Sequence, residues 1–253
     1  MNHDGTINVT AQGHEKLREY LLSHPMVSLE NFQTSNSPKI TFKRNNWTRQ
    51  LYCANPEVGE TYGLIEIMDN NPLVCADSAS TPGKAATLAL IALAPLIKAG
   101  IILEQPSAAF SFEGDYDEVE KSLELMGWNQ GIVCAGDPIE NQQILAATVL
   151  AAIRMPKDTA ELDDLFEESY ARSFFIRRGK PQDNWQEILK DQPFAVYSFH
   201  PIEPAEETIL RINVLSDAEG KAGSAQMIHM LNIMAGFEED AGLNIPLAQN
   251  QTA

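Results

Sequence analysis

The 253-residue sequence contains few cysteines and few basic residues. Its cysteines, Cys53, Cys75 and Cys134, are widely spaced, odd in number and never arranged as Cys-x-x-Cys. They therefore indicate neither a disulfide framework nor a zinc site, and a reducing compartment is the simpler interpretation. The 18 lysines and arginines are outnumbered by 35 acidic residues, which gives a formal net charge of −17. Because so negative a surface repels phosphate backbones and acidic lipids, we expect neither nucleic acid nor a membrane as a partner.

Long hydrophobic runs are also missing. The longest, residues 85–99, contains Pro95 and is shorter than the roughly 20 residues that a membrane-spanning helix needs. The first residues, Met1 to Gly5, have neither the basic nor the apolar region of a secretory signal. Hydrophobic residues make up 44% of the chain and charged residues 21%. We therefore expect a folded, cytoplasmic protein of one large domain or two.

Short apolar segments that favour strands alternate with amphipathic segments that favour helices. Strands are expected at residues 7–9, 27–32, 73–76, 101–103, 108–112, 132–135, 174–176, 194–199 and 209–215. Helices are expected at residues 14–24, 82–99, 117–126, 159–170 and 223–236, and the apolar run 144–155 fits either structure. Residues 10–13 resemble a turn, and residues 33–60 a loop or weak hairpin. This order predicts an α/β arrangement that leads into α+β.

Four cations surround one tryptophan in the polar segment 33–60. They are Lys39, Lys43, Arg44 and Arg49, on either side of Trp47. The cluster could form a small anion site, but such clusters more often form the solvated face of a hairpin.

Residues 73–100 carry the clearest local signals. We expect a buried strand at 73–76, then Thr81 as the cap of a helix that starts at Pro82 and ends at Gly100. Apolar side chains occur on every side of this helix, which indicates burial on every side. Cys75, in the expected strand, is interpreted as a small buried hydrophobe, and so is Cys134 in its own apolar run.

Three segments, in the same order along the chain, carry a resemblance to a known family. The first segment consists of Tyr62-Gly63-Leu64-Ile65-Glu66 and, further along, Thr81-Pro82-Gly83-Lys84-Ala85-Ala86-Thr87. The second consists of residues 165–171 and 175–177, and the third of residues 221–226 and 232–237. Together they resemble the N-acetyl-γ-glutamyl-phosphate reductases of the semialdehyde dehydrogenase family.

The resemblance implies a reduced Rossmann-like N-terminal part packed on an α+β domain of the semialdehyde-dehydrogenase type. Residues 1–80 are then expected to form the Rossmann-like part, which the C-terminal helix 222–237 rejoins. Residues 81–221 are expected to form the α+β domain used for dimerisation and catalysis. Members of the family use NADPH to reduce an acyl phosphate to a semialdehyde in amino-acid biosynthesis.

The family's nucleophile is a cysteine at the start of the buried helix, where the helix dipole lowers the pKa of its thiol. Lys84 stands at the matching position, and an ammonium cannot replace the attacking thiolate. Either Lys84 is a solvated lysine at an inactive site, or its amine carries altered chemistry. Ser80, Thr81 and Thr87 are its expected polar neighbours.

The rest of the family's machinery is also missing from the sequence. Residues 101–153 contain no histidine and no arginine, although the family's acid–base histidine comes from the middle of its second domain. His200 and His229 lie elsewhere, and His229 is expected to be a packed histidine. The segment 10–16 holds one glycine where a dinucleotide-binding turn needs about three, and it would place Glu15 beside a phosphate.

Space for a full cofactor domain is short as well. The segment before Leu73 cannot hold a complete six-stranded doubly wound sheet, because each βαβ unit takes about 30 residues. Met230 stands where the family places an asparagine near the nicotinamide. We therefore expect no bound cofactor, although the family uses NADP, and no metal site.

Two functional hypotheses follow. In the first, the chain is a pseudoenzyme that keeps the fold and acts through binding, regulation or structure. In the second, it is an enzyme with altered chemistry at Lys84. In either case we expect a homo-oligomer formed through the sheet of the second domain, which includes 194–199 and 209–215, and a small-molecule ligand or protein partner that the sequence does not name.

Overall fold

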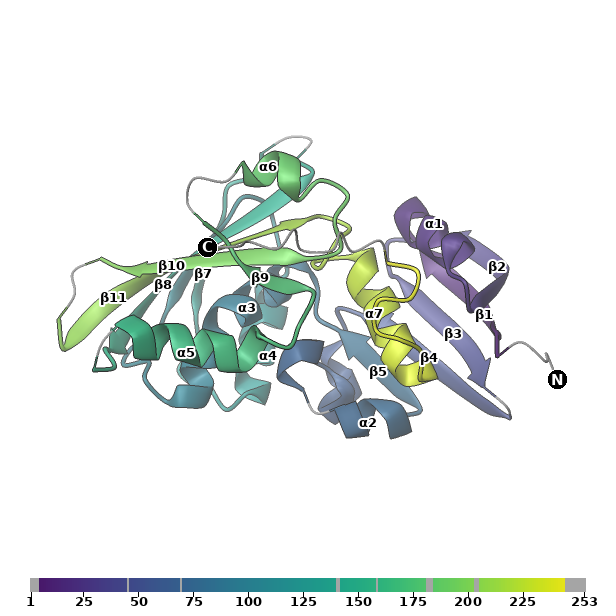
Figure 1. Ribbon diagram of the computed structural model, residues 1–253, viewed down its shortest axis with the longest axis horizontal. Helices are drawn as coiled ribbons and strands as arrows, with labels where there is room; N and C mark the ends of the chain where they lie inside the picture. Colours follow the sequence, from purple (N-terminus) through teal and green to yellow (C-terminus); the bar gives the residue numbers. More distant parts are fainter. Residues whose placement is uncertain are drawn as a thin grey trace, which may run out of the picture.

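The computed structural model describes residues 5–44, 46–68, 70–139, 142–157, 159–180, 184–202 and 205–243. Two mixed β-sheets lie side by side (Figure 1). The predicted combination of a reduced Rossmann-like part and an α+β part is confirmed. The first sheet uses residues 7–81 and the second residues 107–217, while the domain limits at 80/81 and 221/222 stay a prediction.

The first sheet has the strand order β2-β1-β3-β4-β5. Its strands are β1 (Ile7–Gly13), β2 (Val27–Thr34), β3 (Lys39–Arg44), β4 (Trp47–Cys53) and β5 (Ser78–Thr81). β1 is parallel to β2 and β4 is parallel to β5, but β3 is antiparallel to both of its neighbours. The segment 10–13, expected to be a turn, is the end of β1, because it pairs with β2 on one side and β3 on the other.

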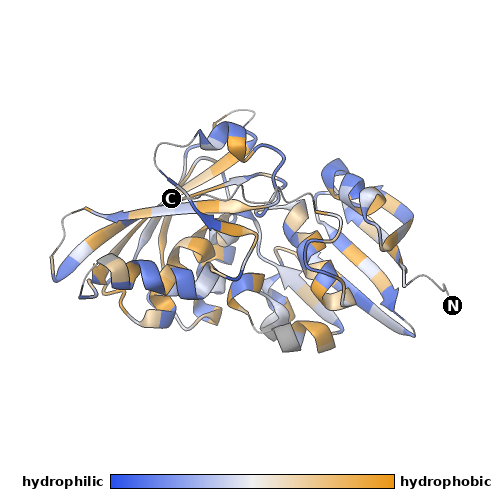
Figure 2. Cartoon of the chain, in the orientation of Figure 1, coloured by the Kyte–Doolittle hydropathy of each residue, from blue (hydrophilic) through white to orange (hydrophobic). Residues whose placement is uncertain are grey.

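Helices cover one face of this sheet. They are α1 (Glu15–Ser23), α2 (Asn70–Cys75) and α7 (Ser224–Ala235), with α7 in contact with both of the others and with β4. Val9 points toward these helices and is buried, whereas its neighbours Asn8 and Thr10 are exposed. Figure 2 shows the same alternation as orange and blue bands along the strands. A doubly wound parallel sheet is apolar on both faces because helices cover both of them. The strands of this sheet are apolar on one face only, which explains why the helices form a single layer.

Arg49 changes the interpretation of the cation cluster. The strands β3 and β4 pair as an antiparallel hairpin, but Arg49 is buried between α2 and α7 and serves neither as an anion site nor as a solvated cation. It donates hydrogen bonds to the carbonyls of Leu73, Ala76 and Met234, at the ends of these two helices.

The second sheet has the strand order β7-β6-β8-β11-β10-β9. Its strands are β6 (Ser107–Phe110), β7 (Val133–Gly136), β8 (Ile144–Arg154), β9 (Ile176–Arg178), β10 (Ala195–Pro201) and β11 (Glu207–Asp217). The ambiguous run 144–155 is thus a strand, and all of β8 pairs with β11. Residues 101–103, expected to be a strand, make only a single bridge at Ile102.

Three helices pack on one face of the second sheet: α3 (Lys84–Ala99), α4 (Tyr116–Leu125) and α5 (Thr159–Tyr170) (Figure 1). The short α6 (Trp185–Ile188) lies on the opposite face near one end. The remaining short elements, η1 (Pro56–Thr61) and η2 (Ile65–Ile67), connect β4 to α2.

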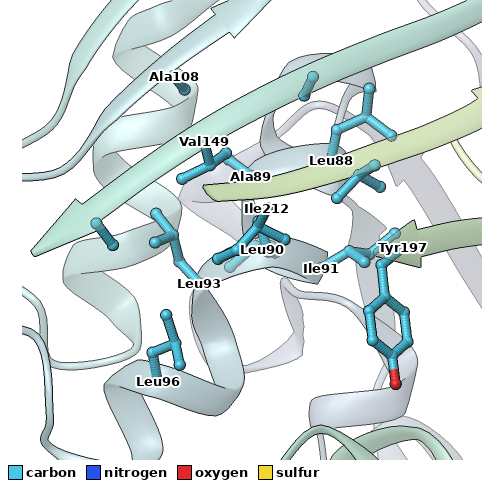
Figure 3. Packing of buried hydrophobic residues seen from close by; sticks show 14 of the residues in the cluster. Leu88, Ala89, Leu90, Ile91, Leu93, Leu96, Ala108, Val149, Tyr197 and Ile212 are labelled. Atoms are coloured by element: carbon cyan, nitrogen blue, oxygen red, sulfur yellow. The ribbon is translucent and has the colours of Figure 1, made fainter. Parts of the chain in front are cut away.

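The helix α3 forms the centre of the larger core. All residues from Ala85 to Leu96 are buried, as the sequence predicts, and Figure 3 shows Leu90 and Leu93 packed beneath Val149 of β8 and Ile212 of β11. Gly100 ends the helix in the left-handed conformation, with φ 65°. In the described part of the chain, no helix combines the length and hydrophobicity needed to cross a membrane.

Two predictions for the segment before α3 are wrong. Residues 73–75 are the end of helix α2, and Cys75 is exposed; the actual strand is β5, at 78–81. Thr81 is the last residue of that strand and Gly83 is the N-cap, so α3 begins at Lys84, two residues later than expected.

Candidate functional site

The start of α3 presents Lys84 at the edge of the buried core. The strand β5 leads through Pro82 into Gly83, whose extended backbone directs the chain into the helix. The Lys84 side chain is 41% exposed, and its Nζ lies 3.4 Å from Glu219 Oε1. Glu219 Oε2 accepts a hydrogen bond from the Ser224 hydroxyl at 2.5 Å. The amine is therefore held in an ion pair beside the N-terminus of α7.

A carboxylate of the protein itself occupies the first turn of α3. Glu118, from α4, accepts hydrogen bonds at one oxygen from the Gly83 N–H and the Tyr62 hydroxyl, both at 2.8 Å. A Cβ at position 83 would lie 2.5 Å from the other oxygen of Glu118. Burial raises the pKa of Glu118, and the two hydrogen bonds act in the opposite direction. A helix N-terminus attracts anions, and here Glu118 already satisfies that attraction.

The threonines expected beside Lys84 have structural roles. The Thr87 hydroxyl donates to the Pro82 carbonyl at 3.2 Å, and Gln226 Nε2 of α7 contacts both groups at 3.1 Å. Thr81 is fully buried. These contacts fix the turn before α3 and join it to α7.

Cys53 is a nearby residue that the sequence did not single out. It is the last residue of β4 and pairs with Thr81 of β5. Burial raises the pKa of the Cys53 thiol to about 11, with the Lys84 charge acting in the opposite direction. At neutral pH this thiol is therefore protonated and a poor nucleophile. Cys134 is half-buried, and burial also raises the pKa of its thiol to about 11.

A buried charged cluster lies around the middle of α7 and the segment just before it, and sequence reasoning missed it. Lys221 Nζ is fully buried and lies 2.7 Å from Glu66 Oε1. His229 is buried as expected, its ring stacks on Phe175, and its Nε2 lies 3.0 Å from Glu239 Oε2. Burial lowers the pKa values of Lys221 and His229. Glu66 and Lys221 both belong to the segments that carry the family resemblance, but nothing in the sequence shows that they pair.

The β1–α1 connection does not fit a dinucleotide. β1 pairs with β2 up to its last residue, Gly13, and α1 starts at Glu15. A Cβ on Gly13 would lie 2.9 Å from the Leu17 side chain, so this glycine allows α1 to pack closely on the strand. The Glu15 carboxylate lies in the helical turn where a pyrophosphate would bind, and Arg18 contacts it at 2.8 Å.

Comparison with known proteins identifies the relatives of this chain. No family model matches it. It is 28% identical over 226 residues to an N-acetyl-γ-glutamyl-phosphate reductase of Bacillus cereus strain B4264, covering 74% of this chain and 63% of the relative. The reductase of strain 03BB102 is 28% identical over 250 residues, which cover 83% of this chain and 70% of the relative. A reductase of Acetivibrio thermocellus is 26% identical over 224 residues, which cover 73% of this chain and 62% of the relative.

A solved structure gives the fold class. The aspartate semialdehyde dehydrogenase II of Vibrio cholerae, in complex with ASA, superimposes with a TM-score of 0.62 at 11% identity, covering 91% of this chain and 98% of the other. The fold is therefore that of the semialdehyde dehydrogenases. Within that class, the chain is a divergent relative of the N-acetyl-γ-glutamyl-phosphate reductases. It spans about two thirds of the length of those it matches.

Proposed function

We propose that this chain does not catalyse NADPH-dependent reduction and acts instead by binding, in a regulatory or structural role. The observation that carries the proposal is the occupied start of α3: Lys84 is held in an ion pair, and the Glu118 carboxylate binds the Gly83 N–H. The family resemblance is what assigns position 84 to the nucleophile. An acyl phosphate brought to this turn would meet a negative charge already in place. The β1–α1 connection supports the same conclusion for the cofactor.

Measurements of cofactor binding and reductase activity test this proposal. NADPH is titrated into the full chain by calorimetry, and the Bacillus cereus reductase serves as the positive control. We expect no heat of binding up to about 1 mM NADPH and no NADPH oxidation with N-acetyl-γ-glutamyl phosphate. A micromolar dissociation constant, or turnover above the buffer rate, would overturn the proposal.

An enzyme with altered chemistry at Lys84 is the alternative. The partial exposure of this side chain at a rigid helix start favours it, because a fixed amine in contact with solvent can attack a carbonyl carbon. Borohydride reduction in the presence of aldehydes would trap the resulting Schiff base. Labelling of Lys84 well above that of Lys98, an exposed lysine at the other end of α3, would support this function; equal labelling would contradict it.

A further inference from the structure

The strand β7 forms one edge of the second sheet and, among the described strands, pairs with β6 alone. The N–H groups of Val133 and Asp137 each donate at 3.0 Å to a carbonyl on the β6 side. Because backbone groups alternate in direction along a strand, the N–H and carbonyl groups of Cys134 and Gly136 point away from the sheet. The outer edge of β7 therefore has the backbone groups that a further strand needs.

Carboxylates stand at both ends of this edge. A Cβ on Gly131, just before β7, would lie 3.1 Å from Glu120 Oε1 of α4, and a Cβ on Gly136 would lie 3.3 Å from Glu113 Oε2. Both glutamates are exposed, and no ion pair seen in the described part of the chain involves either of them. Asp137, directly after β7, adds a third exposed carboxylate. The edge is therefore strongly negative.

The two sides of β7 differ in character. Cys134 faces the helices and packs against the larger core, on the side where α4 carries Glu120. Val133 and Ala135 face the open side of the sheet and are exposed. A strand added at this edge would place its successive side chains alternately on these two sides. One set of its side chains would meet carboxylates, and the other set would meet apolar groups.

Charge and geometry together select the partner. Charged side chains beside an edge strand limit which chains can pair with it, and the carboxylates here disfavour acidic segments. A segment with basic and apolar residues in alternation satisfies both sides of the edge. We propose that β7 binds an extended, cationic segment of another protein, which adds a strand to the second sheet. This edge uses other residues than the start of α3, so partner binding here does not depend on the loss of reductase activity.

Defined peptides titrated into the full chain test this edge. The probe is a fluorescein-labelled heptapeptide of alternating lysine and valine, followed by fluorescence anisotropy at about 100 mM NaCl. We expect a dissociation constant below about 0.5 mM. A peptide of the same composition, with its lysines and valines in separate blocks, should bind at least about fivefold weaker, because it cannot match both sides of the edge. The alternating peptide with every backbone nitrogen methylated should weaken as much, because it cannot donate to the strand.

Hydrogen exchange on the same complex locates the contact. The N–H groups of Cys134 and Gly136 should exchange at least about fivefold more slowly when the alternating peptide is bound, because they then donate to its carbonyls. The N–H groups of Val133 and Asp137 already bond within the sheet and should change less.

Two pairs of substitutions provide the matched control. Glu113→Gln combined with Glu120→Gln removes the carboxylates beside β7 and should weaken binding about fivefold. Glu167→Gln combined with Glu168→Gln removes the same charge from exposed positions on α5 and should change the affinity by less than about twofold, because charges more than a Debye length apart are screened. All four side chains are exposed, so both variants should fold.

Several results would overturn this proposal. They are no binding of the alternating peptide, equal affinity of the block or methylated peptide, unchanged exchange at Cys134 and Gly136, and equal affinities of the two paired variants. The peptide series and the exchange measurement use the unmodified protein, so they decide the question even where a variant does not fold.

Discussion

Arg49 illustrates how one buried residue can hold several elements together. The last carbonyls of a helix have no partner within the helix and need donors from elsewhere. The Arg49 guanidinium supplies them to Leu73 and Ala76 at the end of α2, and to Met234 at the end of α7. Its guanidinium also lies over the ring of Trp47, with its centre 4.3 Å from the ring centroid. The side chain that looked like part of an anion site is instead a cap for two helices.

Replacing this guanidinium should destabilise the fold. Arg49→Met keeps much of the side-chain volume but leaves three carbonyls without their donor, at roughly 1–3 kcal/mol for each group that stays buried. We expect the free energy of unfolding, measured with urea, to fall by about 3 kcal/mol or more. Arg49→Lys should lose less, because the ammonium can still donate to some of these carbonyls. Arg18→Met, at an exposed position, should change stability by under about 0.5 kcal/mol; a similar loss there would contradict this account.

Individual site residues were predictable from the sequence to different degrees. Lys84 was correctly placed at the start of the buried helix, because a turn followed by continuous apolar residues is a local signal. The contacts of Glu118 and the pairing of Glu66 with Lys221 join segments far apart in the chain, and no local pattern reports them. The exposure of Cys75 was missed because a short apolar run fits a strand and a helix end equally well.

Among the elements, α7 connects the two parts of the molecule, and a histidine fixes its place against α1. His24 follows α1, and its Nε2 lies 2.8 Å from Asn232 Oδ1 of α7. Its Nδ1 accepts a hydrogen bond from the Met26 N–H at 3.1 Å, so this nitrogen must be unprotonated. Burial lowers the pKa of His24, and the hydrogen bond to Asn232 acts in the opposite direction. The neutral ring is therefore part of the folded structure.

This histidine should make stability depend on pH. The pKa of His24 is lower in the folded state, so the unfolded chain takes up the proton first as the pH falls through about 6.5. Its contribution should be complete above that pH and be lost progressively below it. Urea unfolding between pH 5 and 8 measures the effect, and His24→Gln should flatten the curve relative to the wild type.

Other groups also change their pKa values on folding, so the comparison needs a control. The raised pKa of Glu118 acts in the opposite direction, because the folded state then holds its proton to a higher pH. Only the difference between the wild-type and His24→Gln curves isolates His24. His14→Gln, at the exposed cap of α1, should follow the wild-type curve; parallel curves for all three proteins would show that His24 does not contribute.

The elements themselves were largely predictable where their hydrophobic pattern was long. The helices α3, α5 and α7 lie close to the expected ranges, because their apolar side chains repeat over several turns. The strand β5 was missed because its residues, Ser78 to Thr81, are small and mostly polar and give no strand signal. The end of β1 was mistaken for a turn because Gln12 and Gly13 carry turn-like chemistry, whereas both residues pair with β2 and Gln12 also pairs with β3.

At the scale of the molecule, the second sheet leaves much of one face open. Val133 of β7, Leu150 of β8 and Ile209 of β11 point away from α3 and are exposed. Ala109 and Ala135 are exposed on the same face, which also carries the polar Arg211 beside Leu150. A sheet face with several exposed apolar side chains is typical of an interface between subunits. We propose that a second copy of the chain covers it.

A charge placed on this face should separate the subunits. We expect the wild-type protein to be a dimer at micromolar concentration by light scattering or analytical ultracentrifugation. Leu150→Glu should shift it to monomer, because a carboxylate placed in a buried interface loses its hydration at a cost of several kcal/mol, even with Arg211 as a cross-strand neighbour. Leu22→Glu, at an exposed apolar position on α1, should leave the dimer intact. A wild-type monomer, or a dimer that persists in Leu150→Glu, would contradict the proposal.

The overall architecture followed from the family resemblance, but the details of the first sheet did not. The antiparallel β3 and the single helical layer depend on how the strands pair across the sheet, and the pattern of each strand alone cannot give that order.

The carboxylate that Glu118 places at the start of α3 also limits what chemistry this helix end can support. A cysteine substituted at position 84 would stand next to the amide that Glu118 already binds, so we expect the negative charge of Glu118 to offset the acidifying effect of the helix start on the thiol. A reactive thiol at this position would then require a second change at position 118, which lies on a different helix.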